Sequence, residues 1–186
     1  MFKTNVTMRA NTDRERMKKM DSKTKTMAEA ALFAALACIA TMIIKIPSPL
    51  KGYLNLGDCV VLAAGWMLSP LYGFLAAGLG SALADVFSGY AAYAPATFVI
   101  KGLMAPIAYY GFRMLRGKIS VVKCRIFSGA IAEITMVLGY FLFEAVLYGA
   151  AAAAVNALPN GVQGAAGLIL GTAFVHALEK SKIMSH

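Results

Sequence analysis

Apolar residues in this chain gather into long continuous runs. A helix needs about 20 residues to cross a hydrocarbon core of about 30 Å. Six runs approach or exceed the length that a span requires: Met27–Ile46, Gly57–Ser69, Leu71–Ser88, Pro95–Leu115, Cys124–Ala150 and Ala157–Leu178. The pattern predicts an all-α integral membrane protein, a bundle of six transmembrane helices.

The second run is short, and Ser69-Pro70 separates it from the third by a tight turn. We therefore expect these two runs to form a helical hairpin that is tilted or stops short of the full bilayer. The runs are rich in Ala, Leu and Gly and lack the alternation of apolar and polar residues that a transmembrane barrel needs. Membrane-spanning strands are therefore not expected.

Composition supports this interpretation. Of 186 residues, 59% are apolar and only 15% charged, whereas ordinary globular proteins have about 25% charged residues. The net charge of +9 would suit a nucleic-acid partner in a soluble chain, but eight of the 18 basic residues precede the first run and five lie between Arg113 and Arg125. We interpret them as determinants of topology and expect no nucleic-acid partner.

The distribution of Lys and Arg predicts the orientation. With the N-terminus inside, fifteen basic residues lie on the cytoplasmic side, while Lys45 and Lys51 lie outside and Lys101 lies within the fourth run. Both termini are therefore predicted to be cytoplasmic. Residues 1–26 are expected to be a basic tail, either mobile or a short interfacial helix, followed by a membrane domain over 27–178 and a short tail over 179–186.

Five ionisable residues lie at membrane depth, where each is a candidate for function because charges are costly to insert there. In the predicted topology, four of them come from four different helices and converge on the outer leaflet: Asp58, Asp85, Lys101 and Glu144. Glu133 falls about two turns in from the cytoplasmic end of the fifth run, and we assign it no role.

Aromatic and amide side chains lie near these ionisable groups. They are Tyr53, Asn55, Tyr90, Tyr93, Tyr140, Tyr148, Asn156, Asn160 and Gln163. Flat aromatic faces with a few convergent polar groups favour a pocket for a small heteroaromatic molecule. Two structural alternatives remain: the tyrosines form an interfacial belt, or Lys101 forms a purely structural ion pair with Asp58 or Asp85.

Enzyme and metal chemistry find little support. The two histidines, His176 and His186, lie toward the cytoplasmic side, and the three cysteines have no CxxC spacing. The chain has no GxxxxGK[ST] phosphate loop and is not expected to hydrolyse a nucleotide itself, so any active transport would take its energy from another source. We predict no catalytic residues, no metal site and no cofactor.

Four sequence segments resemble a known family. They are Gly52–Asp58 (GYLNLGD), Leu68–Gly73 (LSPLYG), Gly78–Asp85 (GLGSALAD) and Tyr93–Gly102 (YAPATFVIKG). Over roughly residues 27–178 the chain resembles the substrate-binding (S) components of energy-coupling-factor (ECF) vitamin transporters, of the riboflavin-type and hydroxymethylpyrimidine-type subgroup.

The resemblance implies a multi-pass protein of a prokaryotic cell membrane that binds a vitamin from outside. A membrane scaffold subunit and two ATPase subunits would supply the energy. The family's pocket maps to Tyr53, Asn55, Tyr93, Lys101, Glu144 and Asn156, to which the charge argument adds Asp58 and Asp85. The family's alanine-rich scaffold contact maps to the small-xxx-small pairs Ala30/Ala34 and Ala31/Ala35 of the first run.

The charges give a first indication of the ligand. Asp58, Asp85 and Glu144 face the single lysine Lys101, so the pocket is net negative if all are ionised, and neutral or cationic ligands are favoured. The candidates are vitamins or precursors similar to hydroxymethylpyrimidine, pyridoxine, thiamine or riboflavin. An autonomous carrier or channel, and an assembly subunit without a ligand, remain as alternatives.

Overall fold

The computed structural model describes residues 2–47 and 53–181, with side chains for 20–46 and 53–181. Within these ranges the chain forms six helices: α1 (Phe2–Ile43), α2 (Gly57–Met67), α3 (Pro70–Phe87), α4 (Ala94–Leu115), α5 (Val121–Tyr148) and α6 (Ala150–Lys180). Strands β1 (Ile46–Pro47) and β2 (Tyr53–Leu54) form a short antiparallel ladder that the sequence did not predict. Lys51, Gly52 and Lys182 lie outside the described residues.

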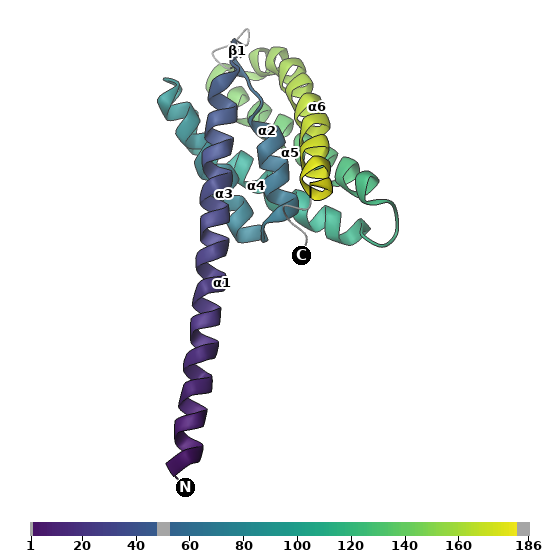
Figure 1. Ribbon diagram of the computed structural model, residues 1–186. Coiled ribbons are helices and arrows are strands. Elements are labelled where there is room, and N and C mark those ends of the chain that lie inside the picture. The colour runs from purple at the N-terminus through teal and green to yellow at the C-terminus, as the bar shows by residue number, and fades with distance from the viewer. Residues whose placement is uncertain (1, 48–52, 182–186) are drawn as a thin grey trace.

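The short helix α2 is the centre of the bundle. α3 packs against α1 and α4, and α5 packs against α4 and α6. Helix α2 contacts α1, α3, α4 and α6 and, over a smaller area, α5. Nearly every residue of α2 from Gly57 to Gly65 is buried. The β ladder lies at one end of the bundle, and α1 extends far beyond the opposite end (Figure 1). All five longer helices therefore surround a central helix that is too short to cross a bilayer alone.

Breaks between helices follow from local chemistry. Ser69 is extended and Pro70 occupies the first turn of α3, where its missing N–H costs nothing. At the other break, Gly149 has a φ of 88°, a conformation that glycine adopts without strain. α6 consequently starts at Ala150, seven residues before the predicted Ala157, because the alanine run after Gly149 is an excellent helix former.

The N-terminal segment differs from the prediction of a mobile tail or short interfacial helix. Helix α1 runs without a break from Phe2 through the first apolar run to Ile43. Residues 2–26 contain neither Gly nor Pro, so nothing in the local sequence ends the helix before the apolar run begins. An ion pair of Lys25 with Glu29, four residues apart at 4.0 Å, adds modest support.

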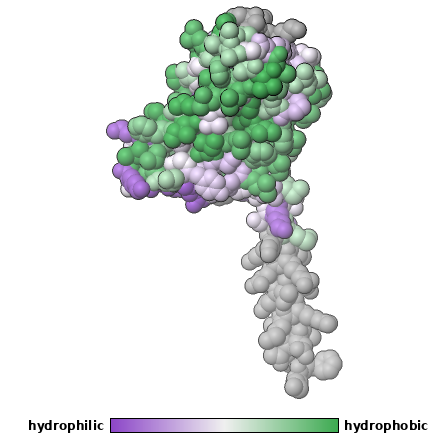
Figure 2. Space-filling view, turned by 180° about the vertical axis from the view of Figure 1, so that it is seen from behind, coloured by the Kyte–Doolittle hydropathy of each residue, from purple (hydrophilic) through white to green (hydrophobic). Residues whose placement is uncertain are grey.

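Within the part of the chain that the structure describes, four helical segments are long and apolar enough to span a membrane: Met20–Ile43, Pro70–Phe87, Val121–Tyr148 and Ala150–Lys180. Helix α4 has 22 residues but is less apolar because it contains Lys101, tyrosines and prolines. Helix α2, with 11 residues, is about 16 Å long at 1.5 Å per residue. Figure 2 shows hydrophobic side chains over most of the body and hydrophilic ones along the edge from which α1 extends.

Small residues bring α1 and α3 into close contact. A Cβ at Gly80 would lie 2.9 Å from the Cβ of Ala37 and would collide with the backbone carbonyl of Ala34. Ala30 is buried and Ala34 half-buried on this side of α1, whereas Ala31 and Ala35 are exposed. The two AxxxA pairs thus lie on different faces of the helix, one packed within the bundle and one open.

Candidate ligand-binding site

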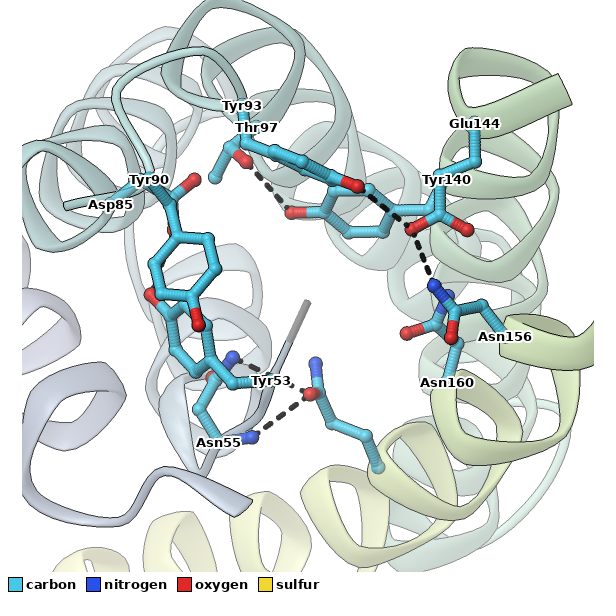
Figure 3. A pocket seen from close by; sticks show the side chains of 11 residues that line it. Tyr53, Asn55, Asp85, Tyr90, Tyr93, Thr97, Tyr140, Glu144, Asn156 and Asn160 are labelled. Atoms are coloured by element: carbon cyan, nitrogen blue, oxygen red, sulfur yellow. Dashed lines mark hydrogen bonds between the residues drawn. The ribbon is translucent and has the colours of Figure 1, made fainter. Parts of the chain in front are cut away.

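A pocket opens at the end of the bundle that carries the β ladder. Its lining comes from β2, α3, the α3–α4 turn, α4, α5 and α6, and consists of Tyr53, Asn55, Asp85, Tyr90, Tyr93, Thr97, Tyr140, Glu144, Asn156, Asn160 and Gln163 (Figure 3). The pocket contains about 450 Å³ of empty space when its open mouth is included, with a cavity volume of about 40 Å³. A larger ligand therefore requires the lining side chains to move apart.

Tyrosines form one wall of the pocket. The rings of Tyr53 and Tyr90 are 4.9 Å apart, and those of Tyr90 and Tyr93 meet edge to face at 6.5 Å. Phe143 supports Tyr93 with a further edge contact at 5.2 Å. This wall offers apolar faces together with phenolic hydroxyls, the combination that binds flat polar molecules.

Asp85 supplies one carboxylate of the pocket. The hydroxyl of Tyr53 donates a hydrogen bond of 2.7 Å to Asp85 Oδ1, while Oδ2 is buried without a partner among the described residues. Burial, and then the charge of Asp85, raises the pKa of the Tyr53 hydroxyl well above its usual value. Tyr53 is therefore a protonated donor to Asp85.

Glu144 supplies a second carboxylate, on α5. Asn156 Nδ2 donates to Glu144 Oε1 at 3.0 Å, and the Tyr93 hydroxyl approaches the same oxygen at 3.5 Å. The other oxygen, Oε2, is buried and has no partner among the described residues. Two carboxylates from different helices thus each present one uncommitted oxygen, and a buried acceptor left unpaired is costly.

A polar network closes the floor beneath the pocket. Lys101 forms an ion pair with Asp58, which lies in the first turn of α2, where the helix dipole also favours a carboxylate. Gln163 Nε2 donates to Asp58 Oδ2 at 2.7 Å, and Gln163 Oε1 accepts from the Asn55 backbone N–H at 2.9 Å. The network ties β2, α2, α4 and α6 together directly under the ligand pocket.

Glu133 borders this floor, although the sequence placed it toward the cytoplasmic half of α5. Both of its carboxylate oxygens are buried without a partner among the described residues. A Cβ at Gly167 would lie 2.6 Å from Asp58 Cβ and 3.1 Å from Glu133 Oε1. Because Gly167 has no side chain, α6 can pack closely against both Asp58 of α2 and Glu133 of α5.

The pocket contains six of the eight predicted ligand residues: Tyr53, Asn55, Asp85, Tyr93, Glu144 and Asn156. Asp58 and Lys101 do not line it and instead form the ion pair below. Among the remaining lining residues, Thr97 is the one that the sequence analysis did not single out. Thr97 lies one turn after Tyr93 and one turn before Lys101. This spacing of i, i+4 and i+8 places the three polar residues on one face of an apolar helix, and it is the pattern by which the sequence could have indicated Thr97.

Thr97 and Tyr140 complete the pocket between α4 and α5. Their hydroxyl oxygens are 3.0 Å apart and share a hydrogen bond. Among the described residues, no group of three or more His, Cys, Asp or Glu side chains is arranged to hold a metal ion. The side chains that line the pocket can recognise a ligand through hydrogen bonds, aromatic faces and negative charge.

A bundle of long apolar helices with a polar, aromatic pocket at one end indicates a multi-pass membrane protein with a candidate site for a small molecule among its helices. The family model of the ECF-type riboflavin transporter S component matches residues 21–180, and the chain belongs to this family. Proteins of this family are membrane vitamin-binding subunits of ECF transporters, not a class of enzymes. The resemblance seen in the sequence is thereby confirmed.

Two individual proteins are similar to this chain. A protein of Pyrococcus woesei, described as "Uncharacterized protein in gap 3'region", is 36% identical over 143 residues, which are 76% of this chain and 93% of the relative. A solved structure, "Structure and mechanism of the S component of a bacterial ECF transporter", matches with a TM-score of 0.66 and 20% identity over 87% of this chain and 99% of that one. At this identity the second match establishes a shared fold.

Proposed function

We propose that this protein is the high-affinity binding subunit for uptake of a small, flat B-type vitamin or precursor, neutral or cationic, with N–H or O–H groups to donate. One observation carries the proposal: Asp85 and Glu144 both line a pocket rich in tyrosines, and each has one buried carboxylate oxygen without a hydrogen-bond partner among the described residues. A ligand that donates to both oxygens removes two unpaired acceptors, which favours binding.

The charge balance supports a neutral or cationic ligand. The nearby lysine, Lys101, is paired with Asp58 below the pocket, and among the described residues neither Asp85 nor Glu144 has an ion-pair partner within 4.0 Å. An anionic vitamin would face two carboxylates in a poorly solvated site, where like charges repel strongly. Hydroxymethylpyrimidine, pyridoxine and thiamine meet these requirements, and riboflavin meets them through its imide N–H and hydroxyls.

We also infer six membrane crossings with both termini in the cytoplasm. The long helices α1, α3, α5 and α6 have the required length and apolar character, and α4 lies between α3 and α5 in the bundle. The end that carries the α4–α5 connection and the start of α1 holds most of the basic residues, which favours the cytoplasmic side. The ligand pocket then faces outward.

Energy for transport, in this proposal, comes from a scaffold subunit and two ATPase subunits that contact this protein. The exposed pair Ala31 and Ala35 on α1 supports a helix-packing surface, since small residues let a partner helix approach closely. Apolar side chains flank this pair, and Leu32 is 59% exposed. Ala30 and Ala34 face the bundle instead, so the partner surface that we propose is the Ala31/Ala35 face.

Native mass spectrometry and calorimetry of the purified protein test the function. We expect one retained or added molecule of hydroxymethylpyrimidine, pyridoxine, thiamine or riboflavin, and no binding of pantothenate, an anionic vitamin of similar size. Preferred binding of pantothenate would contradict the charge argument. Ion or solute flux through liposomes that contain this protein alone would favour an autonomous carrier or channel.

A further inference from the structure

A second cavity lies at the end of the bundle opposite the ligand pocket, among the ends of α2, α4, α5 and α6. Its volume is about 390 Å³, roughly ten times that of the ligand pocket. Its polar lining includes Arg116, Ser120, Arg125, His176 and Glu179, and Trp66 and Phe112 contribute aromatic faces. No residue of this cavity takes part in the vitamin site.

Arg125 is the unusual residue in this cavity. Its side chain is only 2% exposed, and one guanidinium nitrogen, Nη2, donates to Glu179. The other two nitrogens, Nε and Nη1, are buried and have no hydrogen-bond partner among the described residues. Phe112 packs near the guanidinium, 5.9 Å from ring centre to Cζ. A buried arginine with two unpaired nitrogens lacks an acceptor.

The charges and geometry indicate which acceptor is missing. Glu179 is half-exposed and already bound to Nη2, while Arg116 adds a second positive charge to the same cavity. The planar N–H fork of arginine matches the oxygens of a phosphate group, and the arginine charge strengthens each hydrogen bond. A phosphate bound here would satisfy Nε and Nη1 and balance the excess of positive charge.

An apolar groove adjoins the cavity on the outer surface of α5 and α6. It is lined by Val122, Ile126, Leu168, Ile169, Thr172, Ala173 and His176, and its surface is almost wholly apolar. Val122 and His176 belong to both the cavity and the groove. A phosphate site that continues into an apolar channel along membrane helices fits an amphiphile better than a soluble anion.

We propose that this end of the protein binds one anionic phospholipid, with its phosphate on Arg125 and Arg116 and one acyl chain in the groove between α5 and α6. Arg125 lies in the second turn of α5, close to the basic α4–α5 connection, so the phosphate sits at the depth of lipid headgroups. The proposal rests on the protein being embedded in a membrane and is independent of which vitamin it carries.

Lipid binding by the full-length protein, delipidated in detergent, tests the proposal. Three probes separate the possible sources of the phosphate: dioctanoyl phosphatidylglycerol, dioctanoylglycerol with the same chains and no phosphate, and inorganic phosphate with no chains. We expect one phosphatidylglycerol per protein, with each of the other two probes bound at least about tenfold more weakly. Equal binding of inorganic phosphate, or of dioctanoylglycerol, would overturn the assignment.

Three variants locate the bound lipid. Arg125→Lys keeps the positive charge beside Glu179 but removes the N–H fork, and Ala173→Trp fills the groove without touching the arginine. Each should weaken phosphatidylglycerol binding about tenfold or more and leave vitamin binding unchanged. Lys123→Gln removes a charge on the same helix that lines neither the cavity nor the groove, and should bind like the wild type. Wild-type affinity in both Arg125→Lys and Ala173→Trp would refute the site.

Discussion

Lys101 of α4 pairs with Asp58 of α2, under the pocket, while Asp85 instead accepts a hydrogen bond from Tyr53 on the pocket wall. The sequence left both carboxylates open as partners of the lysine. Because Gln163 binds the second oxygen of Asp58, this carboxylate is fully committed within the protein. The pair therefore supports the pocket from below, whereas Asp85 lines the pocket itself.

This arrangement predicts the outcome of charge-removal experiments. Lys101→Met strands a buried carboxylate and should lower the free energy of unfolding by about 3–5 kcal/mol. Adding Asp58→Asn should restore most of that loss, because the uncompensated charge disappears. Adding Asp85→Asn to Lys101→Met instead of Asp58→Asn should not restore the lost stability. Denaturant unfolding in detergent measures the stability of all three variants. Equal rescue by Asp85→Asn would contradict the pairing of Lys101 with Asp58.

The pocket carboxylates should control affinity. Glu144→Gln keeps the shape and one carbonyl oxygen but removes the negative charge, so vitamin binding should weaken by about 1–3 kcal/mol, or roughly 5- to 150-fold. Isothermal titration calorimetry measures the change. Glu29→Gln, which removes a half-buried carboxylate on α1 that does not line the pocket, is the matched control. If both variants bound equally well, Glu144 would not contact the ligand.

Two glycines of α6 provide a matched test of close packing. Gly167→Ala places a Cβ against Asp58 and Glu133 and should destabilise the fold by about 1–3 kcal/mol. Gly161 has no atom within 4 Å of an added Cβ, so Gly161→Ala should stabilise the helix by up to about 1 kcal/mol. Thermal unfolding compares the two, and stabilisation by both would mean that α6 does not approach the floor this closely.

The two faces of α1 should respond differently to a large side chain. Ala35→Trp adds bulk on the exposed face and should prevent co-purification with a scaffold subunit while leaving vitamin affinity unchanged. Ala34→Trp adds bulk beside Gly80 of α3 and should destabilise the fold itself. Unchanged complex formation by Ala35→Trp would remove this face from the proposed interface.

Single cysteines can test the orientation. In a background without Cys38, Cys59 and Cys124, cysteines introduced at the exposed positions Ala92 and Ser120 should react with an impermeant maleimide from opposite sides of the membrane. Ala92 should react in intact cells, and Ser120 only after permeabilisation. Reaction of both from the same side would contradict the six-span topology.

Several local features could be predicted because their causes lie within a few residues. The apolar runs of α3 and α4 define these helices to within one residue, the run of α5 defines it to within three, and Pro70 marks the start of α3. The early start of α6 was missed because a single glycine, Gly149, makes the turn that we had assigned to a longer connection. The continuation of the N-terminal helix into the first apolar run was not predicted, because the basic segment has no apolar period that would mark it as helical.

The sequence by itself determined that apolar helices would form the protein, that polar residues would converge at one end and that the chain resembled transporter S components. These follow from hydropathy, helical period and motifs, which are local properties. Only the tertiary structure decided that Lys101 pairs with Asp58, that Glu133 borders the same floor, and that Ala34 packs against α3 while Ala35 is exposed. Those outcomes depend on the depth and rotation of each helix, which the packing of glycines and alanines between helices fixes.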